Sequence, residues 1–409
     1  MIRDALLALG VLFSTASQLR LAGLPLGPGE FCLTLWLATA LGRRPIRPPP
    51  QMKVFFLLLL FWLLFAFAQS IGMLVGLMIE PIRDTASIRH DMLAYGLMAA
   101  VSCTAAVELE ARPHLRRINW LIAGFGTIFL VLLLADASGL FNIPRIDSWY
   151  WNRLRGWSEN PNQFALLAMV LTALSAYLAE TGTNPFEVLI ALGCAGLAFS
   201  AGLLTRSDSY LLFLIVAGPI FLGLKLWSWT QLFERGPPFR AKLACIIVLS
   251  LPLQLLALAP FVPAVVAQAQ TLTTATFEDN DQGETRLNLW KEAVSIGVEA
   301  KMLGYGPGPH LTSKSYKRPP PDRFEAHNTL LDLFSQGGIL AVFVFLWLIG
   351  WSFFLSCRGK IHTLAGLVCG LTVFGMFHLI VRHPIFWFGI TLCLVEGVRA
   401  QAVRAQEGR

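Results

Sequence analysis

The sequence predicts an all-α protein that crosses a membrane about a dozen times, and three observations support this fold class. The chain has 409 residues and is 55% hydrophobic. Only 14% of the residues are charged, against about 25% in an average soluble domain. The apolar residues form long blocks separated by short polar stretches. Runs of about 18 or more apolar residues are typical of transmembrane helices.

The apolar blocks divide the chain into three expected regions. An N-terminal transmembrane bundle occupies residues 1–266, a large loop occupies 267–326, and C-terminal transmembrane helices occupy 327–409. The block over 161–180 would be about 30 Å long as a helix, which matches the hydrocarbon core of a bilayer. The predicted spans are 4–20, 29–42, 53–79, 91–109, 118–137, 161–180, 185–203, 208–226, 241–264, 327–350, 361–380 and 384–400.

The long loop is predicted to be partly ordered. Leu287, Trp290, Val294 and Val298 recur at helical spacing, so an amphipathic helix is expected over about 285–299. The glycines and proline of 304–308 predict a turn after this helix. A loop of about 60 residues between two spans is far longer than the usual connection, and loops of this length are usually functional or disordered.

The distribution of basic residues predicts the orientation. Lys and Arg at the ends of the spans are roughly twice as frequent on the side of the N-terminus as on the opposite side. Both termini are therefore expected to be cytoplasmic, and the long loop is expected on the outer face. The net charge of +7 is explained by these span-end residues, which meet lipid headgroups. No nucleic-acid-binding module is present in the sequence.

Three arginines at the outer face are candidates for an anion site. Arg153 lies shortly before Asn160 and Pro161, which suit the N-cap and first position of a helix. Arg206 lies in a very short connection between two spans, where an ionisable group is a functional candidate; its alternative is an ion pair with Asp208. Arg286, taken alone, is more often a solvated charge on the loop helix.

His327 is the strongest candidate for a general base. It stands with Asn328 where the long loop returns to the membrane. A histidine can accept a proton from a hydroxyl group near neutral pH. The alternative is a histidine at a helix end that is bonded to a backbone carbonyl. His378 and His383 form a second polar pair near the same face, for which helix-end positions are the simpler explanation.

Aromatic residues gather at one outer boundary. Trp149, Tyr150, Trp151 and Trp157 lie within nine positions of each other. An interfacial belt of aromatic residues accounts for them, although stacking against sugar rings is also compatible with them.

Taken together, these stretches resemble the O-antigen ligase and polymerase family of bacterial inner-membrane enzymes. The resemblance covers about 150–340, and Trp290 stands where the ligase pattern has leucine, so ligase and polymerase both remain open. The matching stretches are Arg153–Gly156 with Asn160-Pro161-Asn162, Thr205-Arg206-Ser207, Arg286–Trp290 with Gly304-Tyr305-Gly306, and His327-Asn328 with Gly338.

The resemblance implies a glycosyltransferase that inverts the configuration of the sugar and needs no metal or cofactor. Its donor would be a glycan on undecaprenyl diphosphate, and its acceptor would be lipid A-core or a growing polysaccharide at the periplasmic face. His327 would be the base, and Arg153, Arg206 and Arg286 would stabilise the departing diphosphate. Residues implied to contact substrate are Arg155, Asn160, Asn162, Gly304, Gly306, Lys314, Lys317, Arg318 and Asn328.

Two other classes of function are compatible with a polytopic protein. A polysaccharide or lipid transporter would carry charges near the middle of several spans and often an internal repeat. The sequence has few charges within its spans and no repeat. A scaffold for an envelope complex is a more distant alternative. The sequence does not identify the sugar, its linkage, the acceptor, the oligomeric state or partner proteins.

Overall fold

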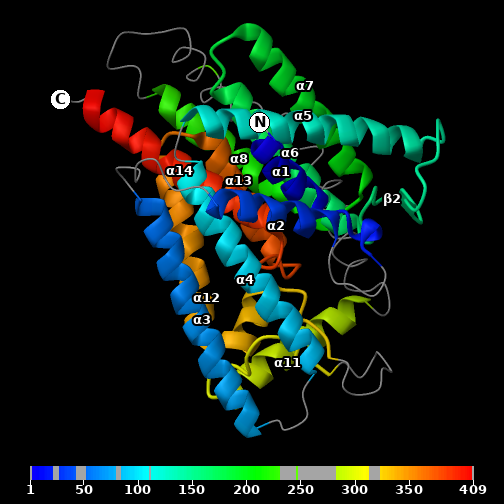
Figure 1. Cartoon of the computed structure of the whole chain (residues 1–409), viewed down its shortest axis with the longest axis vertical. Coiled ribbons are helices and arrows are strands. Elements are labelled where there is room, and N and C mark those ends of the chain that lie inside the picture. The colour runs from blue at the N-terminus through cyan, green and yellow to red at the C-terminus, as the bar shows by residue number, and fades with distance from the viewer. Residues whose placement is uncertain are drawn as a thin grey trace.

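A computed structural model describes residues 2–21, 27–42, 52–79, 84–109, 112–230, 246, 282–312 and 323–407. These residues form helices joined by short connections and one small hairpin (Figure 1). The elements are α1 (Ile2–Phe13), η1 (Ser17–Leu19), α2 (Pro28–Leu41), α3 (Lys53–Ile79), α4 (Thr85–Glu108), α5 (Arg112–Ala137), β1 (Trp149–Tyr150), β2 (Arg153–Leu154), α6 (Pro161–Glu180), α7 (Pro185–Leu204), α8 (Asp208–Thr230), α11 (Gln282–Glu299), α12 (Thr329–Arg358), α13 (His362–Gly375) and α14 (Pro384–Glu407).

Seven helices in the described part of the chain are long and apolar enough to cross a membrane. These helices are α3, α5, α6, α7, α8, α12 and α14. They confirm a multi-pass all-α membrane protein, while the predicted total of about twelve spans stays a prediction. The expected span over 241–264 lies outside the described residues.

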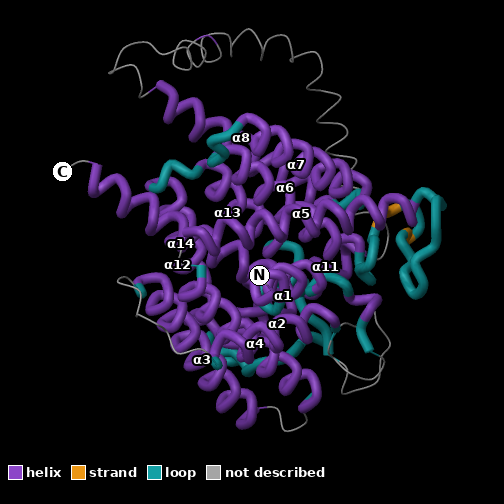
Figure 2. Tube along the Cα trace, turned by 45° about the horizontal axis from the view of Figure 1, so that its top comes forward, coloured by secondary structure: helices purple, strands orange, loops and turns teal. Residues whose placement is uncertain are grey.

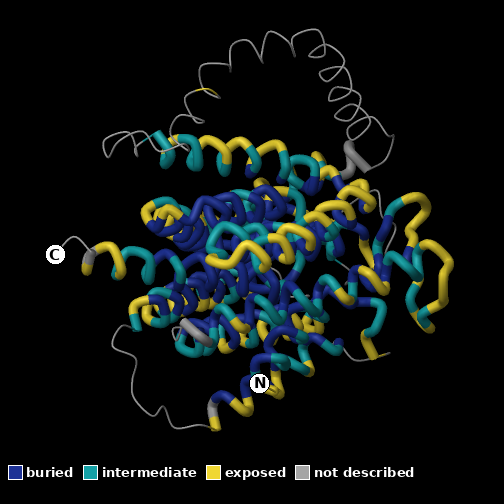
Figure 3. Tube along the Cα trace, turned by 90° about the horizontal axis from the view of Figure 1, so that it is seen from above, coloured by how far each residue is buried: buried dark blue, intermediate teal, exposed yellow. Residues whose placement is uncertain are grey.

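Helix α6 is the centre of the bundle. It packs against α5, α7, α8 and α13, and most of its side chains are buried. The buried residues lie in the middle of the molecule, and exposed ones cover the outer helices (Figure 3). A helix that is apolar on every side and buried by its neighbours is typical of the interior of a membrane bundle. Its ends are therefore held firmly, and both carry polar side chains.

The loop helix α11 lies against α12 at one end of the molecule (Figure 1). Its observed bounds, Gln282–Glu299, agree with the helix expected over about 285–299. The predicted apolar face is wrong in part: Leu287, Val294 and Val298 are exposed, and the buried residues are Leu289, Ala293 and Ile296. Helices α3 and α12 run side by side, as both views show (Figures 1 and 2). The segment after α11 bonds to the backbone of α12: Gly306 N–H donates to the Gln336 carbonyl at 2.7 Å.

Gly338 interrupts α12 because its backbone is left-handed, with a φ of 65°. A Cβ at this position would lie 2.0 Å from the Met302 carbonyl oxygen, so glycine is required. Ile339 N–H donates to that same oxygen at 2.9 Å. The break in α12 is therefore where the segment following α11 is attached to the membrane bundle.

Three details of the sequence-based assignment are wrong. The first expected span, 4–20, is a helix only to Phe13 and then turns through η1. Helix α13 ends at Gly375 rather than near residue 380. Trp157 is not part of an interfacial belt: its side chain is buried, its ring contacts Phe13 and Phe129, and its indole N–H donates to the Thr15 hydroxyl at 3.0 Å.

Candidate active site

His327 occupies a strained turn immediately before α12. Its φ is 52°, a left-handed value that costs a residue with a Cβ about 1 kcal/mol or more. Asp332, buried in the first turns of α12, holds this conformation. Its Oδ1 accepts the Ala326 N–H at 2.6 Å, and its Oδ2 accepts the Asn328 N–H at 3.2 Å. One carboxylate therefore binds the peptide groups on both sides of His327.

The same turn is tied to the loop helix. The indole N–H of Trp290, on α11, donates to the Ala326 carbonyl oxygen at 3.0 Å. Arg286 lies four residues before Trp290 and hence about one helical turn away on the same face. The hydrogen bond at Ala326 therefore fixes the position of Arg286 relative to His327.

Burial and two neighbouring arginines lower the pKa of His327. Desolvation is the largest cause, and the guanidinium groups of Arg286 and Arg382 act in the same direction, whereas Glu325 raises it. The His327 ring is nevertheless exposed to a cavity rather than packed. A lowered pKa leaves the imidazole neutral at pH 7, which is the form that can accept a proton.

Arg153 is positioned by two hydrogen bonds. Its Nε donates to the Thr205 carbonyl at 3.1 Å, and its Nη2 donates to Asn162 Oδ1 at 2.9 Å. Desolvation is the largest cause that lowers its pKa, which Asp208 opposes and Arg286 reinforces. Arg153 therefore lies between the start of α6 and the α7–α8 connection, within electrostatic reach of Arg286.

Arg206 follows Thr205 in the α7–α8 connection. Its φ is 47° and its side chain is exposed. The expected alternative, an ion pair between Arg206 and Asp208, is not formed among the residues that the structure describes. The charge of Asp208 instead raises the pKa of Arg153. The backbone of Arg206 is thus adjacent to the Arg153 guanidinium, and its own side chain extends outward.

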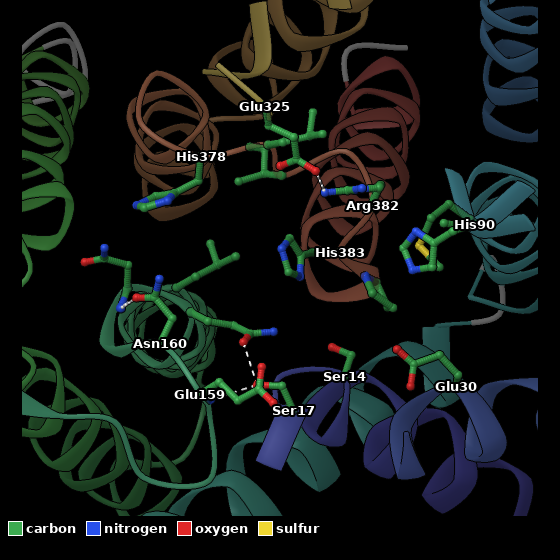
Figure 4. Close-up of a pocket in the computed structure, with 18 of the residues that line it drawn as sticks. Ser14, Ser17, Glu30, His90, Glu159, Asn160, Glu325, His378, Arg382 and His383 are labelled. Carbon is green, nitrogen blue, oxygen red and sulfur yellow. Dashed lines mark hydrogen bonds and ion pairs between the residues drawn. The ribbon is translucent and has the colours of Figure 1, made fainter. Parts of the chain in front are cut away.

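A cavity of about 370 Å³ opens beside His327. Two polar walls face each other across it (Figure 4). One wall comes from α6 and the end of α1, with Ser17, Glu159 and Asn160; the other comes from segments near the ends of α12, α13 and α14. The second wall holds Glu325, His327, His378, Arg382 and His383.

Arg382 joins the wall beside His327 to α4. It forms ion pairs with Asp91, at 2.6 Å, and with Glu325. Asp91 is almost completely buried, and a buried carboxylate requires such a partner. This network holds Glu325 two residues before His327.

His378 and His383 belong to the cavity. His378 Nε2 is 3.3 Å from the Ser209 hydroxyl, and its carbonyl accepts the Thr329 hydroxyl at 2.6 Å. Desolvation, followed by the charge of Arg286, lowers the pKa of His378 to about 3. Desolvation and Arg382 lower the pKa of His383 to about 4. Both rings are therefore neutral at pH 7, and the pair forms part of the wall rather than a separate site.

Of the other residues predicted to contact substrate, two cap helices and one forms an ion pair. Asn160 caps α6 by accepting the Asn162 N–H at 2.8 Å, and Asn328 caps α12 by accepting the Leu330 N–H at 3.0 Å. Arg155 forms an ion pair with Asp147 and lies over the Tyr150 ring in the hairpin. Lys314, Lys317 and Arg318 lie outside the described residues.

Gly304 and Gly306 contact α12. Their φ values are 79° and 96°, and a Cβ on Gly304 would lie 2.3 Å from the Gln336 carbonyl oxygen. Their placement gives both glycines a role in attaching the loop to α12. Among the described residues, no three His, Cys, Asp or Glu side chains gather closely enough to hold a metal ion.

Sequence reasoning missed Asp332, Asp91, Glu325 and Arg382 as parts of the site. A carboxylate within an apolar block, such as Asp332 or Asp91, is a signal that was available. The partner of each depends on which helices are neighbours, and that information comes only from the fold.

Comparison with known proteins gives one match. No curated protein sequence matches the chain. Residues 190–346 match the protein-family model described as O-antigen ligase. This region contains Arg206, Arg286 and His327, together with α11 and the first half of α12. This segment of the chain is therefore similar to the O-antigen ligase domain that the family model describes.

Proposed function

We propose that this protein transfers a glycan from an undecaprenyl-diphosphate carrier to a hydroxyl group of lipid A-core or a growing polysaccharide, at the periplasmic face of the inner membrane. The family match supports a function of O-antigen ligase or polymerase type. The observation that carries the finer proposal is the joint placement of His327 and Arg286 by Ala326 and Trp290.

In this reaction His327 acts on the acceptor. The neutral imidazole takes the proton of the attacking hydroxyl as its oxygen bonds to the anomeric carbon of the first donor sugar. The bond from that carbon to the diphosphate oxygen breaks on the opposite face, so the configuration inverts. The electron pair leaves with the undecaprenyl diphosphate. General base catalysis by a positioned histidine contributes about 10²–10⁴-fold to a rate.

The arginines act on the leaving group. Negative charge develops on the diphosphate as the bond breaks, and fixed guanidinium groups stabilise it before and during the step. Arg153 and Arg286 are the best placed, because each lies within electrostatic reach of the other. Arg206, at the neighbouring connection, would contact the outer part of the diphosphate. No metal ion is required in this scheme.

The proposal is tested with purified full-length protein in liposomes that contain an undecaprenyl-diphosphate-linked glycan and the acceptor glycolipid. Transfer by the wild-type protein in the presence of a metal chelator, with loss of transfer in His327→Ala, is the expected result. Absence of transfer to lipid A-core and to a second carrier-linked glycan would reject the proposal.

Deletion of the gene in the host distinguishes between the two possible acceptors, lipid A-core and a growing polysaccharide. Unmodified lipid A-core together with full-length carrier-linked polymer indicates a ligase, whereas single repeat units indicate a polymerase. Carrier-linked glycan that remains on the cytoplasmic face would instead indicate a transporter.

A further inference from the structure

A second cavity lies at the opposite end of the helices that form the first. The cavity beside His327 is lined by Asn160 and Asn162 near the start of α6 and by Pro384 at the start of α14. The second, of about 540 Å³, is lined by Tyr177 near the end of α6 and by Arg399 to Gln406 on α14. About 17 residues of α6 separate them, or roughly 25 Å. The two cavities therefore lie near opposite boundaries of the membrane.

The charged residues of this second cavity are mostly basic. Arg116 comes from α5, Arg399 and Arg404 come from α14, and Glu396 is the one acidic residue in its lining. With Glu187, the partner of Arg116, also counted, the three arginines exceed the two carboxylates by one formal charge. A cavity with this balance favours an anion, and guanidinium groups match the oxygen geometry of phosphate better than ammonium groups do.

The arginines are held in place by existing contacts. Arg404 donates to the Arg358 carbonyl at 2.7 Å and to the Gly359 carbonyl at 2.9 Å, at the end of α12. Arg399 Nη1 is 3.4 Å from Glu396 Oε1, and Arg116 forms an ion pair with Glu187. A guanidinium group has five N–H donors, so the two contacts of Arg404 orient it without using all its donors.

Much of the rest of the lining is apolar. Leu178, Ile361, Ala400 and Val403 form these parts of the walls, and Thr181 and Gln406 are polar members of the lining. Charged groups beside an apolar wall at the membrane boundary are complementary to an anionic lipid. Its phosphate group would contact the arginines, and its acyl chains would lie along the helices. Basic pockets between transmembrane helices commonly bind the headgroups of anionic lipids.

We propose that this cavity, lined by Arg116, Arg399 and Arg404 between α5, α6 and α14, binds the phosphate group of an anionic membrane lipid. The basic residues at the span ends predict this face to be cytoplasmic. The site is independent of glycan transfer, because it lies at the other end of α6 from His327.

Lipid retention by the full-length protein tests this site. The purified protein is exchanged into detergent with phosphatidylglycerol or phosphatidylcholine, and bound lipid is counted by native mass spectrometry. We expect the wild-type protein to retain phosphatidylglycerol preferentially and Arg399→Gln to bind it about five-fold or more weakly. Arg117→Gln is the matched control, because Arg117 is adjacent to Arg116 on α5 and pairs with Asp4 outside this cavity.

Two further measurements identify the ligand and the location. Ala402→Trp fills the cavity without changing its charge and should also reduce retention. Inorganic phosphate at about 10 mM should not displace the lipid; displacement would mean that the site takes free phosphate instead. Equal retention of the two lipids by the wild-type protein would overturn the proposal, as would equal retention by Arg399→Gln, Ala402→Trp and Arg117→Gln.

Discussion

The two ends of α6 hold their polar groups in different ways. At its C-terminal end, Glu180 accepts hydrogen bonds from Lys225 at 2.7 Å and from the Thr363 backbone N–H at 3.0 Å, and its Oε1 is 3.1 Å from His362 Nδ1. This one carboxylate joins α6, α8 and α13. At its N-terminal end, Asn160 faces a cavity (Figure 4). His327 also lines this cavity and is exposed.

This contrast supports the proposal that the chemistry takes place at the N-terminal end of α6. The partners of Glu180 occupy its carboxylate, so its main contribution is to hold helices together. At the N-terminal end, Asp332 and Trp290 bind the backbone around His327 and leave the ring available. Histidines with shifted pKa values that line a cavity beside an arginine are typical of functional sites.

Replacing the exposed histidine should have the largest effect. We expect His327→Ala to lower the rate of glycan transfer by about 10²–10⁴-fold, because the attacking hydroxyl loses its base. The measurement is transfer in liposomes per mole of folded protein.

The matched control at the C-terminal end of α6 is His362→Ala. It should lose about 1 kcal/mol of stability, since Glu180 loses one of its partners, and should retain wild-type transfer. If both histidine variants kept full transfer, the proposed difference between the two ends would be refuted.

Replacement of the arginine on α11 comes next. We expect Arg286→Lys to lower kcat by about 10²-fold, because an ammonium group lacks the planar fork that binds two diphosphate oxygens. Lys291→Ala, on an exposed face of the same helix, is the control for damage to α11. Full activity in Arg286→Lys would show that a simple point charge is sufficient.

A smaller loss of activity is expected when the hydrogen bonds that hold the His327 turn are weakened. Asp332→Asn places an amide where the carboxylate accepts two backbone N–H groups, so we expect kcat to fall by about 10-fold with little change in KM. Hydrogen exchange at the Ala326 and Asn328 amides should become faster. Asp84→Asn, which alters the cap of α4, controls for a general loss of stability.

A double variant shows whether Asp332 acts through His327. In a His327→Ala background, Asp332→Asn should cost no further activity, because the group that it positions is absent. An additional 10-fold loss in the double variant would mean that Asp332 serves the reaction in another way.

Much of the fold could be predicted from the sequence, because long apolar runs mark the transmembrane helices and capping residues mark where they begin. The bounds of α3 and α6 agree with the predicted spans, and Asn160 and Pro161 take their expected cap positions. Helix α1 is shorter than predicted, because the largely polar stretch Ser14-Thr15-Ala16-Ser17-Gln18 follows Phe13 and forms a turn instead of continuing the helix.

The roles of the site residues stay predictions. Motif spacing indicated Arg153, Arg286 and His327, and Arg286 lies within electrostatic reach of each of the other two. The pairing of Arg382 with Asp91 and Glu325 joins segments nearly 300 residues apart in one case. Such partners depend on which helices are neighbours, and the pattern of a single sequence does not contain that information.

The finest test concerns pH. The neutral form of His327 is required, so kcat/KM should fall as pH decreases through its pKa, which is lowered from 6.5. Glu325 raises that pKa, so Glu325→Gln should move the acid limb of the pH profile to lower pH. Arg286→Gln removes a charge that lowers the pKa of His327, so it should move the acid limb to higher pH. The overall rate of this variant should also be lower. Shifts in the same direction for both variants would mean that another group sets the acid limb.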